Sequence, residues 1–404
     1  MYKPLLRRAV SGLARGLDRA FTETALTPSK RSTRASHAER LDHAGRMRAL
    51  RLVGSFYARP EFLSHENALL PRPRAIAPHV TRVRALASRG DVFDLAWPSE
   101  FEPIWSRAAL MEHLSGLPES KKRELGLLPG AEALAVSGFD RTGDLRDKYL
   151  RARENRTAHA RWFRHSGPAR PCVVLIHGYI GGNYLLEERL WPVKRLFQSG
   201  LDVVLTTLPL HGQRRAQARG YLPPAFPSSD PRFTVEGFRQ LVFDHRALFD
   251  HLQRCGVHQL GVMGMSLGGY SAALLATLER VLRFAVFMVP LAAVEDFAYR
   301  NGRMIGHAAE QLAQREALQR VHHAISPFAR ASRLPAARVV CVAGESDLVT
   351  GVEHARRLSR HFGAQLSLFH GGHLLHAGRE AAFAPVWRLL GEFAAGAFGE
   401  VRDE

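Results

Sequence analysis

One serine of this chain lies in a sequence that suits nucleophilic chemistry. Ser266 is the middle residue of the segment Gly-Met-Ser-Leu-Gly (264–268), which follows an apolar run and precedes a stretch rich in alanine and leucine. A serine on a tight strand-to-helix turn is lifted above a sheet, and glycines two residues before and after it let neighbouring backbone approach the turn. The free N–H groups at the start of the helix also favour negative charge there. We therefore predict that Ser266 is a nucleophile; the alternative is a buried glycine turn with an incidental serine.

A serine nucleophile needs a base, and a neutral imidazole can take the serine proton and return it to the leaving group. The chain has 20 histidines, so position has to decide between them. His373 lies in the segment Phe-His-Gly-Gly-His-Leu-Leu-His (369–376), just after an apolar run, and the Gly-Gly pair before it frees the loop. We predict His373 as the base, with His370 and His376 as alternatives. Their spacing also resembles a metal site, but no carboxylate or cysteine set completes one, so we predict no bound metal.

An acid must hold the histidine ring in one tautomer, and Asp347 follows the apolar run 339–343 closely enough to do so. We prefer Asp347 to Glu345; the alternative is that Asp347 only closes a turn after a strand. The order Ser266, Asp347, His373 along the chain is found in one serine-hydrolase fold and differs from the order in two others.

The tetrahedral intermediate of acyl transfer carries an oxyanion that needs two fixed N–H donors. Leu267, the residue after the nucleophile, would supply one donor through its backbone. The segment His-Gly-Tyr-Ile-Gly-Gly (177–182) follows another apolar run, and its glycines permit a strained path, so we predict the backbone N–H of Tyr179 as the second donor. We expect His177 to orient this loop; the alternative is a turn that merely ends a strand.

These side chains need a rigid support, and the apolar runs of the chain predict one. Strand-like runs occupy residues 92–97, 158–164, 172–176, 203–205, 260–263, 284–289, 339–343 and 366–369. From residue 172 onward the runs do not alternate apolar with polar residues, which is typical of parallel strands buried on both faces. Helical segments are predicted at 184–198, 235–254 and 266–280. We expect Thr234 to cap the second helix, and Gly200 and Gly256 to end the first two. The alternation of strands and helices predicts a doubly wound α/β domain.

The interval between the runs that end at 289 and begin at 339 breaks this rhythm. It has helical character, most clearly at 308–322. So long an excursion above a parallel sheet predicts a lid over the active site, at about residues 291–335. The alternative is an ordinary helix with long flanks.

Positive charge gathers at the start of the chain. The first 60 residues contain 13 Lys and Arg but only 4 Asp and Glu, which accounts for half of the net charge of +18. Apolar residues at helical spacing within 5–21 predict a basic amphipathic helix, and the polar segment 27–36 predicts a flexible link. We predict that residues 1–25 make peripheral contact with an anionic membrane; the alternatives are a helix packed on the main domain and a disordered arm. No zinc-finger or RNA-binding signature is present, so nucleic acid is a minor option.

The composition is that of a globular protein. Hydrophobic residues make up 46% of the 404 residues, and no run of 18 apolar residues predicts a membrane span. The basic N-terminus lacks the apolar core of a secretory signal. Three well-separated cysteines favour buried thiols in a reducing cytosol. We therefore expect a cytoplasmic protein, with any membrane contact peripheral.

Residues from about 158 to 395 resemble the α/β-hydrolase superfamily in the order and setting of these motifs. The segments Gly-Tyr-Ile-Gly-Gly-Asn-Tyr (178–184) and Gly-Met-Ser-Leu-Gly-Gly-Tyr (264–270) also resemble a poorly characterised bacterial branch related to the eukaryotic α/β-hydrolase domain-containing protein eighteen. The resemblance implies an eight-stranded, mostly parallel sheet, a serine-esterase mechanism and no cofactor. We therefore expect a basic extension over residues 1–90 and a hydrolase domain over 91–404 that contains the lid. The resemblance also supports the roles given to Ser266, Asp347, His373, Tyr179 and Leu267.

The substrate leaves a weaker mark on the sequence. Arg214, Arg215 and Arg219 follow the run 203–205 and would suit a phosphate or carboxylate; a solvated basic loop is the alternative. The Phe/Pro-rich stretch 221–233 and the apolar part of the lid would suit an acyl chain. We predict hydrolysis of a carboxylic ester in a small molecule or a lipid. The same residues also serve thioesterases, acyltransferases and peptidases, and a non-catalytic binding module of this fold is the remaining alternative. The sequence does not indicate an oligomeric state.

Overall fold

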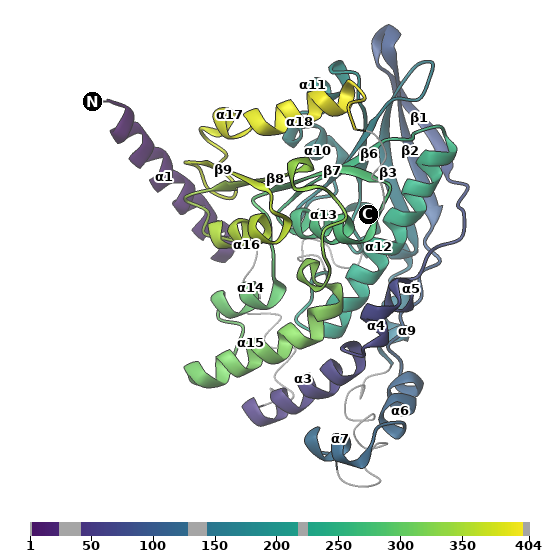
Figure 1. Cartoon of the computed structure of the whole chain (residues 1–404), viewed down its shortest axis with the longest axis vertical. Helices are drawn as coiled ribbons and strands as arrows, with labels where there is room; N and C mark the ends of the chain where they lie inside the picture. Colours follow the sequence, from purple (N-terminus) through teal and green to yellow (C-terminus); the bar gives the residue numbers. More distant parts are fainter. Residues whose placement is uncertain (1, 24–41, 128–143, 217–224, 399–404) are drawn as a thin grey trace.

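A nine-stranded sheet forms the centre of the protein, in a computed structural model that describes residues 2–23, 42–127, 144–216 and 225–398. The strand order is β1-β2-β3-β5-β4-β6-β7-β8-β9. Strands β1 to β3 run antiparallel to their neighbours, and the strands from β5 to β9 run parallel to one another (Figure 1). The bounds are β1 (His79–Ala85), β2 (Gly90–Pro98), β3 (Thr157–His165), β4 (Cys172–Ile176), β5 (Asp202–Thr206), β6 (Leu260–Met265), β7 (Leu282–Met288), β8 (Val339–Gly344) and β9 (Gln365–Phe369). The predicted α/β class with a mostly parallel sheet is confirmed.

The predicted count of eight strands is wrong, because β1 adds a ninth at the edge of the sheet. All seven residues of β1 are exposed, and the strand pairs antiparallel with β2. An edge strand without a buried face leaves no apolar pattern in the sequence, so periodicity does not reveal it. The expected domain boundary between residues 90 and 91 lies within β2, directly after its first residue.

The central strands are buried on both faces, which explains why their sequences do not alternate. In β4, Val173 and Leu175 pack into one hydrophobic cluster, whereas Cys172, Val174 and Ile176 pack into another on the opposite face. Successive side chains of a strand point to opposite faces, so a strand covered on both sides needs apolar residues at every position.

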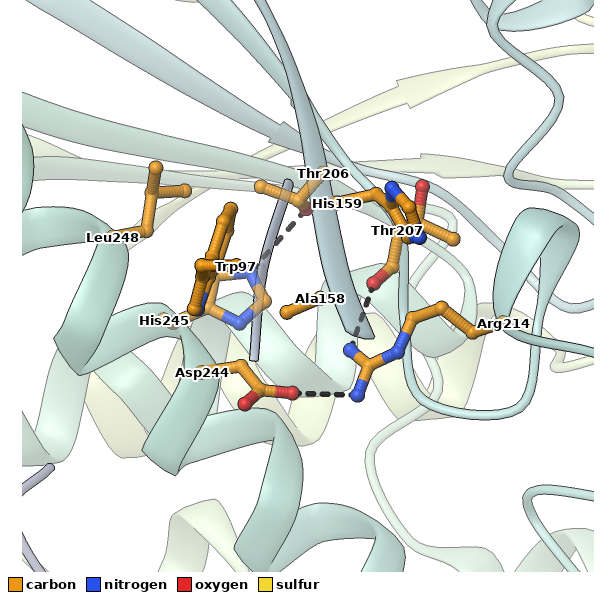
Figure 2. Close-up of a pocket in the computed structure, with 9 residues that line it drawn as sticks. All are labelled: Trp97, Ala158, His159, Thr206, Thr207, Arg214, Asp244, His245 and Leu248. Atoms are coloured by element: carbon orange, nitrogen blue, oxygen red, sulfur yellow. Dashed lines mark hydrogen bonds and ion pairs between the residues drawn. The ribbon is translucent and has the colours of Figure 1, made fainter. Parts of the chain in front are cut away.

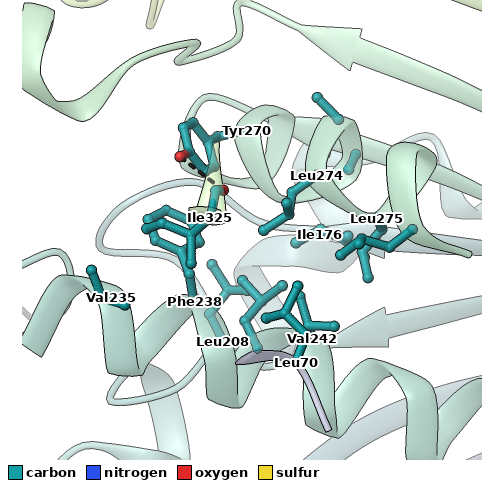
Figure 3. Close-up of a cluster of buried hydrophobic side chains, with 14 of the residues drawn as sticks. Leu70, Ile176, Leu208, Val235, Phe238, Val242, Tyr270, Leu274, Leu275 and Ile325 are labelled. Atoms are coloured by element: carbon teal, nitrogen blue, oxygen red, sulfur yellow. Dashed lines mark hydrogen bonds between the residues drawn. The ribbon is translucent and has the colours of Figure 1, made fainter. Parts of the chain in front are cut away.

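Helices cover both faces of this sheet (Figure 1). One face carries α10 (Tyr184–Leu190), α11 (Val193–Gln198), α17 (Arg379–Ala382) and α18 (Ala384–Ala394), and the other carries α12 (Pro231–Arg254), α13 (Leu267–Leu278) and α16 (Val352–Phe362). Figure 3 shows part of the second face, where Phe238 of α12 and Tyr270 of α13 place their ring centroids 4.4 Å apart. The helix that follows Ser266 is therefore held against the sheet by the main core.

Two predicted helices end as expected, but the first is interrupted. The segment 184–198 forms α10 and α11 instead of one helix, because Pro192 lies between them and has no N–H to donate. Gly200 and Gly256 follow α11 and α12 with φ of 87° and 90°, a left-handed conformation that glycine adopts without penalty.

The start of α12 differs from the prediction. Asp230 is the N-cap, since its carboxylate accepts the N–H of Arg232, and Pro231 occupies the first turn. The expected cap at Thr234 is therefore wrong. The Thr234 side chain instead exchanges hydrogen bonds with the backbone of Ser228, which fixes the loop before the helix.

A further helical layer lies outside α12 and α13. In it α15 (Ala308–His322), which has the predicted bounds, packs along α3 (His43–Tyr57), and α14 (Val294–Arg300) lies next to α15 (Figure 1). Around them lie α4 (Glu61–Ser64), α5 (Glu66–Leu69), α6 (Arg107–Ser115), α7 (Glu119–Glu124) and α9 (Leu145–Leu150). Short 3₁₀ turns complete the chain at η2 (Ala87–Arg89), η3 (Arg153–Arg156), η4 (Gly212–Arg214), η6 (His323–Ile325), η7 (Pro327–Ala329) and η8 (Ala336–Arg338). The expected lid segment thus contacts a helix from the N-terminal part of the chain.

The N-terminal helix α1 (Tyr2–Phe21) lies apart from this layer, at the β9 end of the sheet (Figure 1). None of the helices in the described ranges combines the length and apolar character that crossing a bilayer requires.

Buried charges on α12 attach the N-terminal segments to the core. The Glu236 carboxylate is fully buried, accepts the Tyr57 hydroxyl at 2.6 Å and pairs with Arg239 one turn later. The Arg239 guanidinium also donates to the Leu69 carbonyl at 2.7 Å. A buried charge is tolerated only when it is paired and hydrogen-bonded, so these contacts depend on one another.

We expect Glu236→Gln to destabilise the protein by about 3–5 kcal/mol, because it leaves the buried Arg239 guanidinium without a counter-charge. The measurement is urea denaturation followed by circular dichroism. The matched control is Glu124→Gln, which removes an exposed partner of Lys121 and should leave the unfolding midpoint unchanged. Equal midpoints for the two variants would contradict the prediction.

Candidate active site

Ser266 lies at the junction of β6 and α13 in a strained conformation. Its φ and ψ are 56° and −114°, in a region that residues with a side chain rarely adopt. The flanking glycines are required by close backbone approach: a Cβ on Gly264 would lie 1.9 Å from the Gly268 carbonyl oxygen, and one on Gly268 would lie 2.0 Å from that of Ile176. The strand–turn–helix context expected for the Gly-x-Ser-x-Gly segment is present.

The structure brings together the three side chains that the sequence singled out. The Ser266 Oγ lies 2.9 Å from His373 Nε2, and His373 Nδ1 lies 2.9 Å from Asp347 Oδ2. The three residues follow β6, β9 and β8, whose carboxyl ends lie at the same edge of the sheet. His373 and Asp347 are buried, whereas Ser266 is partly exposed. The hydroxyl of a partly exposed serine thus contacts one nitrogen of a buried imidazole, and Asp347 contacts the other nitrogen.

The alternative residues take other partners. His370 Nδ1 lies 2.5 Å from Glu345 Oε2 at the surface, so the two rivals pair with each other. His376 Nε2 donates to the His373 carbonyl at 2.9 Å and so supports the backbone of the histidine loop. Within the described residues, no group of three or more His, Cys, Asp or Glu side chains is arranged to hold a metal ion.

Asp347 is held as a carboxylate by donors on its own turn. Its Oδ1 accepts the N–H groups of Val349 and Thr350 at 2.8 and 3.0 Å, and its Oδ2 accepts the Thr350 hydroxyl at 2.8 Å. Burial raises the pKa of Asp347, but the charge of His373 and hydrogen bonds from the His373 ring, the Thr350 hydroxyl and the Gly351 N–H outweigh burial and lower the pKa to about 2. Sequence reasoning missed Thr350, although a threonine three residues after an aspartate at a strand end is a signal for such a turn.

The protonation of His373 follows from this anion. Because Asp347 is ionised, the Nδ1 of His373 carries the proton and the Nε2 lone pair faces the Ser266 hydroxyl. Burial lowers the pKa of His373, but the charge and hydrogen bond of Asp347 and the charge of Asp18 together raise it above 6.5. The ring is therefore poised to accept a proton from serine.

The loop after β4 lies against the nucleophile. A Cβ on Gly178 would lie 3.3 Å from that of Ser266. His177 orients this loop, since its Nδ1 donates to the Gly178 carbonyl at 2.7 Å and its Nε2 accepts the Leu208 N–H at 3.1 Å. The predicted oxyanion donors, Tyr179 and Leu267, are the residues that follow Gly178 and Ser266.

The carboxylate of Glu187 supports the same loop, and sequence reasoning missed it. Its Oε1 accepts the Gly182 N–H at 3.0 Å, and its Oε2 accepts the Trp191 indole N–H at 3.1 Å. Glu187 is buried on α10 whereas Leu185, Leu186 and Leu190 are exposed, so the pattern of apolar residues in this helix gave no signal for it.

Arg214 does not have the substrate-binding position that we predicted. Its guanidinium is buried, lies 2.7 Å from the Asp244 carboxylate and donates to the Thr207 carbonyl (Figure 2). It also donates to the Asn155 carbonyl. The cavity around it measures about 10 Å³, which is the size of one water molecule and too small for a substrate. The charge of Arg214 is thus already balanced by Asp244 inside the protein.

Of the other residues expected to bind substrate, only some lie in the described ranges. Arg215 follows η4 and is partly buried. Arg219 and the first part of the stretch 221–233 lie outside the described residues.

Comparisons with known proteins were made by sequence and by structure. No protein-family profile matches the chain. The chain has a TM-score of 0.50 and 14% identity with acetyl xylan esterase 1 of Thermoanaerobacterium sp. JW/SL YS485, over 83% of this chain and 94% of that one. This chain has the α/β-hydrolase fold. An acetyl xylan esterase of Paenibacillus sp. R4 aligns with a TM-score of 0.49 and 14% identity, over 82% of this chain and 94% of that one.

Two curated relatives share part of this hydrolase-fold chain. They are the uncharacterized proteins MT2702 and Rv2627c of Mycobacterium tuberculosis strains CDC 1551 and H37Rv, each 31% identical over 233 residues. The match covers 56% of this chain and 55% of each relative, so the chain spans about half the length of the curated relatives it matches. The resemblance to the bacterial branch related to protein eighteen stays a prediction.

The raised pKa of His373 leads to a prediction about pH. We expect the pKa of the His373 ring to lie above 6.5. Only the neutral ring accepts a proton from serine. On acidification this neutral form should therefore be lost at a higher pH than in an ordinary histidine. Asp347→Asn should lower this pKa, because it removes the anion that stabilises the charged ring. The measurement is NMR of protein with ¹³C-labelled histidine.

His245 is the internal control for this titration, because burial lowers its pKa to about 4 and its ring should stay neutral across the same range. A His373 titration at or below 6.5, or one that Asp347→Asn leaves in place, would contradict the assignment.

Proposed function

We propose that this protein is a serine hydrolase that cleaves carboxylic esters through an acyl-enzyme on Ser266. The observation that carries the proposal is the unbroken chain of contacts from the Ser266 hydroxyl through His373 to Asp347. These groups follow three strands of a hydrolase-fold sheet in the chain order that the fold requires. Mutual orientation of nucleophile, base and acid is the recognisable feature of this chemistry.

The reaction that this geometry supports has two halves. In the first, the Ser266 Oγ forms a bond to the ester carbonyl carbon while its proton passes to His373 Nε2, and His373 then gives that proton to the departing alkoxide as the C–O bond breaks. In the second, a water attacks the acyl-serine, and its proton returns through His373 to the serine oxygen. Asp347 stabilises the imidazolium in both halves without taking the proton.

The oxyanion of each tetrahedral intermediate would be held by backbone N–H groups of Leu267 and Tyr179. Leu267 is the first residue of α13, where a helix leaves its N–H groups without a partner inside the helix. Tyr179 lies in the loop whose Gly178 reaches the Ser266 side chain. The supports from His177 and Glu187 fix this loop before substrate arrives, as preorganised stabilisation demands.

Exposed leucines beside the site support a lipid ester as the substrate class. Leu348 and Leu374 are the neighbours of Asp347 and His373 in sequence, and they are 44% and 47% exposed. Leu13 and Leu17 on α1 are also exposed, at 60% and 43%. Exposed apolar residues that border a catalytic site are typical of a surface that meets apolar material.

The charge of α1 suits an anionic bilayer as the partner of these leucines. The helix contains five basic residues and a single acidic one, Asp18, which is buried. Arg15 and Arg19 are exposed as well, and the spacing of two residues places them on a different face of α1 from Leu13 and Leu17. This combination is typical of helices that lie in the interface of an anionic membrane.

Ser266→Ala should lower the turnover of an activated short-chain ester by about 10⁴–10⁶-fold while the protein stays folded. The measurements are hydrolysis of p-nitrophenyl butyrate and covalent labelling by a fluorophosphonate, which should require Ser266. His373→Gln and Asp347→Asn should each cause a large loss as well.

The matched controls lie on the same two loops. His370→Gln and Glu345→Gln alter the surface pair, which does not touch Ser266, and should retain the turnover of the parent protein. Turnover unaffected by Ser266→Ala would end the proposal, and folded protein that no fluorophosphonate labels would favour a non-catalytic module. Thioester, amide or acyl-transfer activity that exceeds ester hydrolysis would keep the nucleophile and change the substrate class.

The double substitution Leu13→Ser/Leu17→Ser should weaken partition to anionic vesicles by about tenfold or more, because two apolar side chains can no longer leave water. The measurement is co-sedimentation with vesicles of phosphatidylcholine and phosphatidylserine. The residual binding should still fall with salt, since the arginines remain. Leu312→Ser removes a similarly exposed leucine on α15 and should have no effect; equal binding by both variants would reject the role of α1.

A further inference from the structure

Asp18 of α1 reaches into the two loops that carry the acid and the base. Its carboxylate is fully buried, and its Oδ2 accepts the backbone N–H of His373 at 2.8 Å and that of Leu348 at 3.0 Å. Its Oδ1 accepts the N–H of Leu374 at 3.0 Å. One carboxylate therefore joins the residue after Asp347 to the backbone of His373 itself.

The interaction is unusual for a buried carboxylate. Among the residues that the structure describes, the donors to the Asp18 carboxylate are all backbone N–H groups, and no arginine or lysine pairs with it. Burying an unpaired carboxylate costs several kcal/mol unless hydrogen bonds compensate. The three N–H groups are therefore held firmly, since moving either loop away would leave the charge unsatisfied.

Two further contacts fix α1 in this place. The Ser11 hydroxyl donates to the His370 carbonyl at 3.2 Å, at the start of the histidine loop. A Cβ on Gly372 would lie 2.6 Å from Asp18 Oδ2 and 3.2 Å from the Ala14 Cβ. The glycine before His373 is thus needed for the helix to approach, in addition to any freedom that it gives the loop.

The charge of Asp18 also acts on the imidazole. Burial opposes protonation of His373, and Asp18 contributes with Asp347 to the net rise in the pKa of His373. A carboxylate bound to the backbone N–H of a histidine is close enough for its field to favour the imidazolium that forms when serine gives up its proton.

We propose that Asp18 is a positioning residue, by which the N-terminal helix clamps the acid loop to the base loop and holds the backbone of His373 in place. The proposal rests on the ester hydrolase function proposed above. It makes α1 a working part of the active site, and it assigns a role to residues outside the segment that resembles the hydrolase superfamily. Asp18 is not among the residues that contact Ser266, and it acts through the acid loop and the base loop that it binds.

The first test is Asp18→Asn, assayed with a water-soluble short-chain ester so that lipid binding plays no part. We expect kcat to fall by up to about 10²-fold with KM nearly unchanged, because the base is misplaced while the acyl site is intact. The acidic limb of the kcat/KM profile should move to lower pH, since one of the two anions that raise the pKa of His373 is gone. Glu23→Gln removes an exposed carboxylate just after the same helix and should leave kcat and the acidic limb of the profile in place.

The test uses the acidic limb of the kcat/KM profile as well as kcat. A residue with a merely structural role would lower the folded fraction when substituted, but it would not move this limb along the pH axis. A parental kcat and an unmoved limb in Asp18→Asn would overturn the proposal. If Asp18→Asn does not fold, Gly372→Ala tests the clamp from the other side: it should displace Asp18 and cause the same loss of kcat and shift of the limb. A folded Gly372→Ala variant with parental kinetics would overturn it.

NMR titration of His373 separates this proposal from the proposed function. If the protein hydrolyses no ester, the proposed function of Ser266 is wrong. The pKa of His373 should still fall in Asp18→Asn, and in that case the clamp stands. If Ser266→Ala abolishes turnover but Asp18→Asn leaves both the His373 pKa and kcat unchanged, the hydrolase stands and the clamp is wrong.

Discussion

A single imidazole joins three strand ends, and the rest of the hydrolase-fold structure keeps those ends in place. His373 contacts Ser266 through one ring nitrogen and Asp347 through the other, and both contacts fail if any strand end shifts by about an ångström. Backbone hydrogen bonds carry the sheet pairing past the strands themselves: Ser266 donates to Met288 at 2.9 Å, Val289 to Val342 at 2.7 Å, and Glu345 to Phe369 at 2.8 Å. These bonds run across β6, β7, β8 and β9 in turn. The relative positions of the serine, the acid and the base are thus set by the sheet, and the loops add only the last few residues.

The layers outside the sheet are attached by apolar packing, to which Phe56 and Trp105 contribute, and by buried polar contacts. The Glu236–Arg239 pair and the Arg214–Asp244 pair are both buried, and each holds backbone carbonyls from earlier parts of the chain. Buried ion pairs contribute little net stability compared with apolar packing of the same volume, but breaking one is costly. Such contacts therefore define one arrangement of α3, the segment before β3 and the sheet. Arg300 of α14, an exposed residue, donates to the Thr350 carbonyl at 2.8 Å and so connects the expected lid segment to the acid loop.

The sequence was most informative where burial imposes a pattern. Ser266, Asp347 and His373 were each found because they follow an apolar strand, and the parallel order of those strands brings their ends together. The edge strand β1 was missed because nothing covers it, so its composition carries no trace of its pairing. Arg214 was misassigned because an arginine in a loop beside a site has the same sequence signature whether its partner is a substrate or a buried aspartate on α12. Asp18 lies more than 300 residues from the backbone it binds, and no local pattern reports a contact with main-chain N–H groups, which every residue but proline possesses.

The orientation of α1 resolves an apparent conflict between two uses of one helix. Leucines at helical spacing predict that the apolar face is the face that binds, and in water an amphipathic helix normally buries it against its own domain. Here the residues turned toward the histidine loop are Ser11, Ala14 and Asp18, while Leu13 and Leu17 stay exposed. Small and charged residues at this contact give the helix a defined register, because a carboxylate accepts N–H groups only in one position, whereas leucines tolerate sliding. A helix fixed in this way would bring its exposed leucines to a lipid surface without releasing the catalytic loop, because the proposed membrane contact and the proposed support of His373 use different residues of α1.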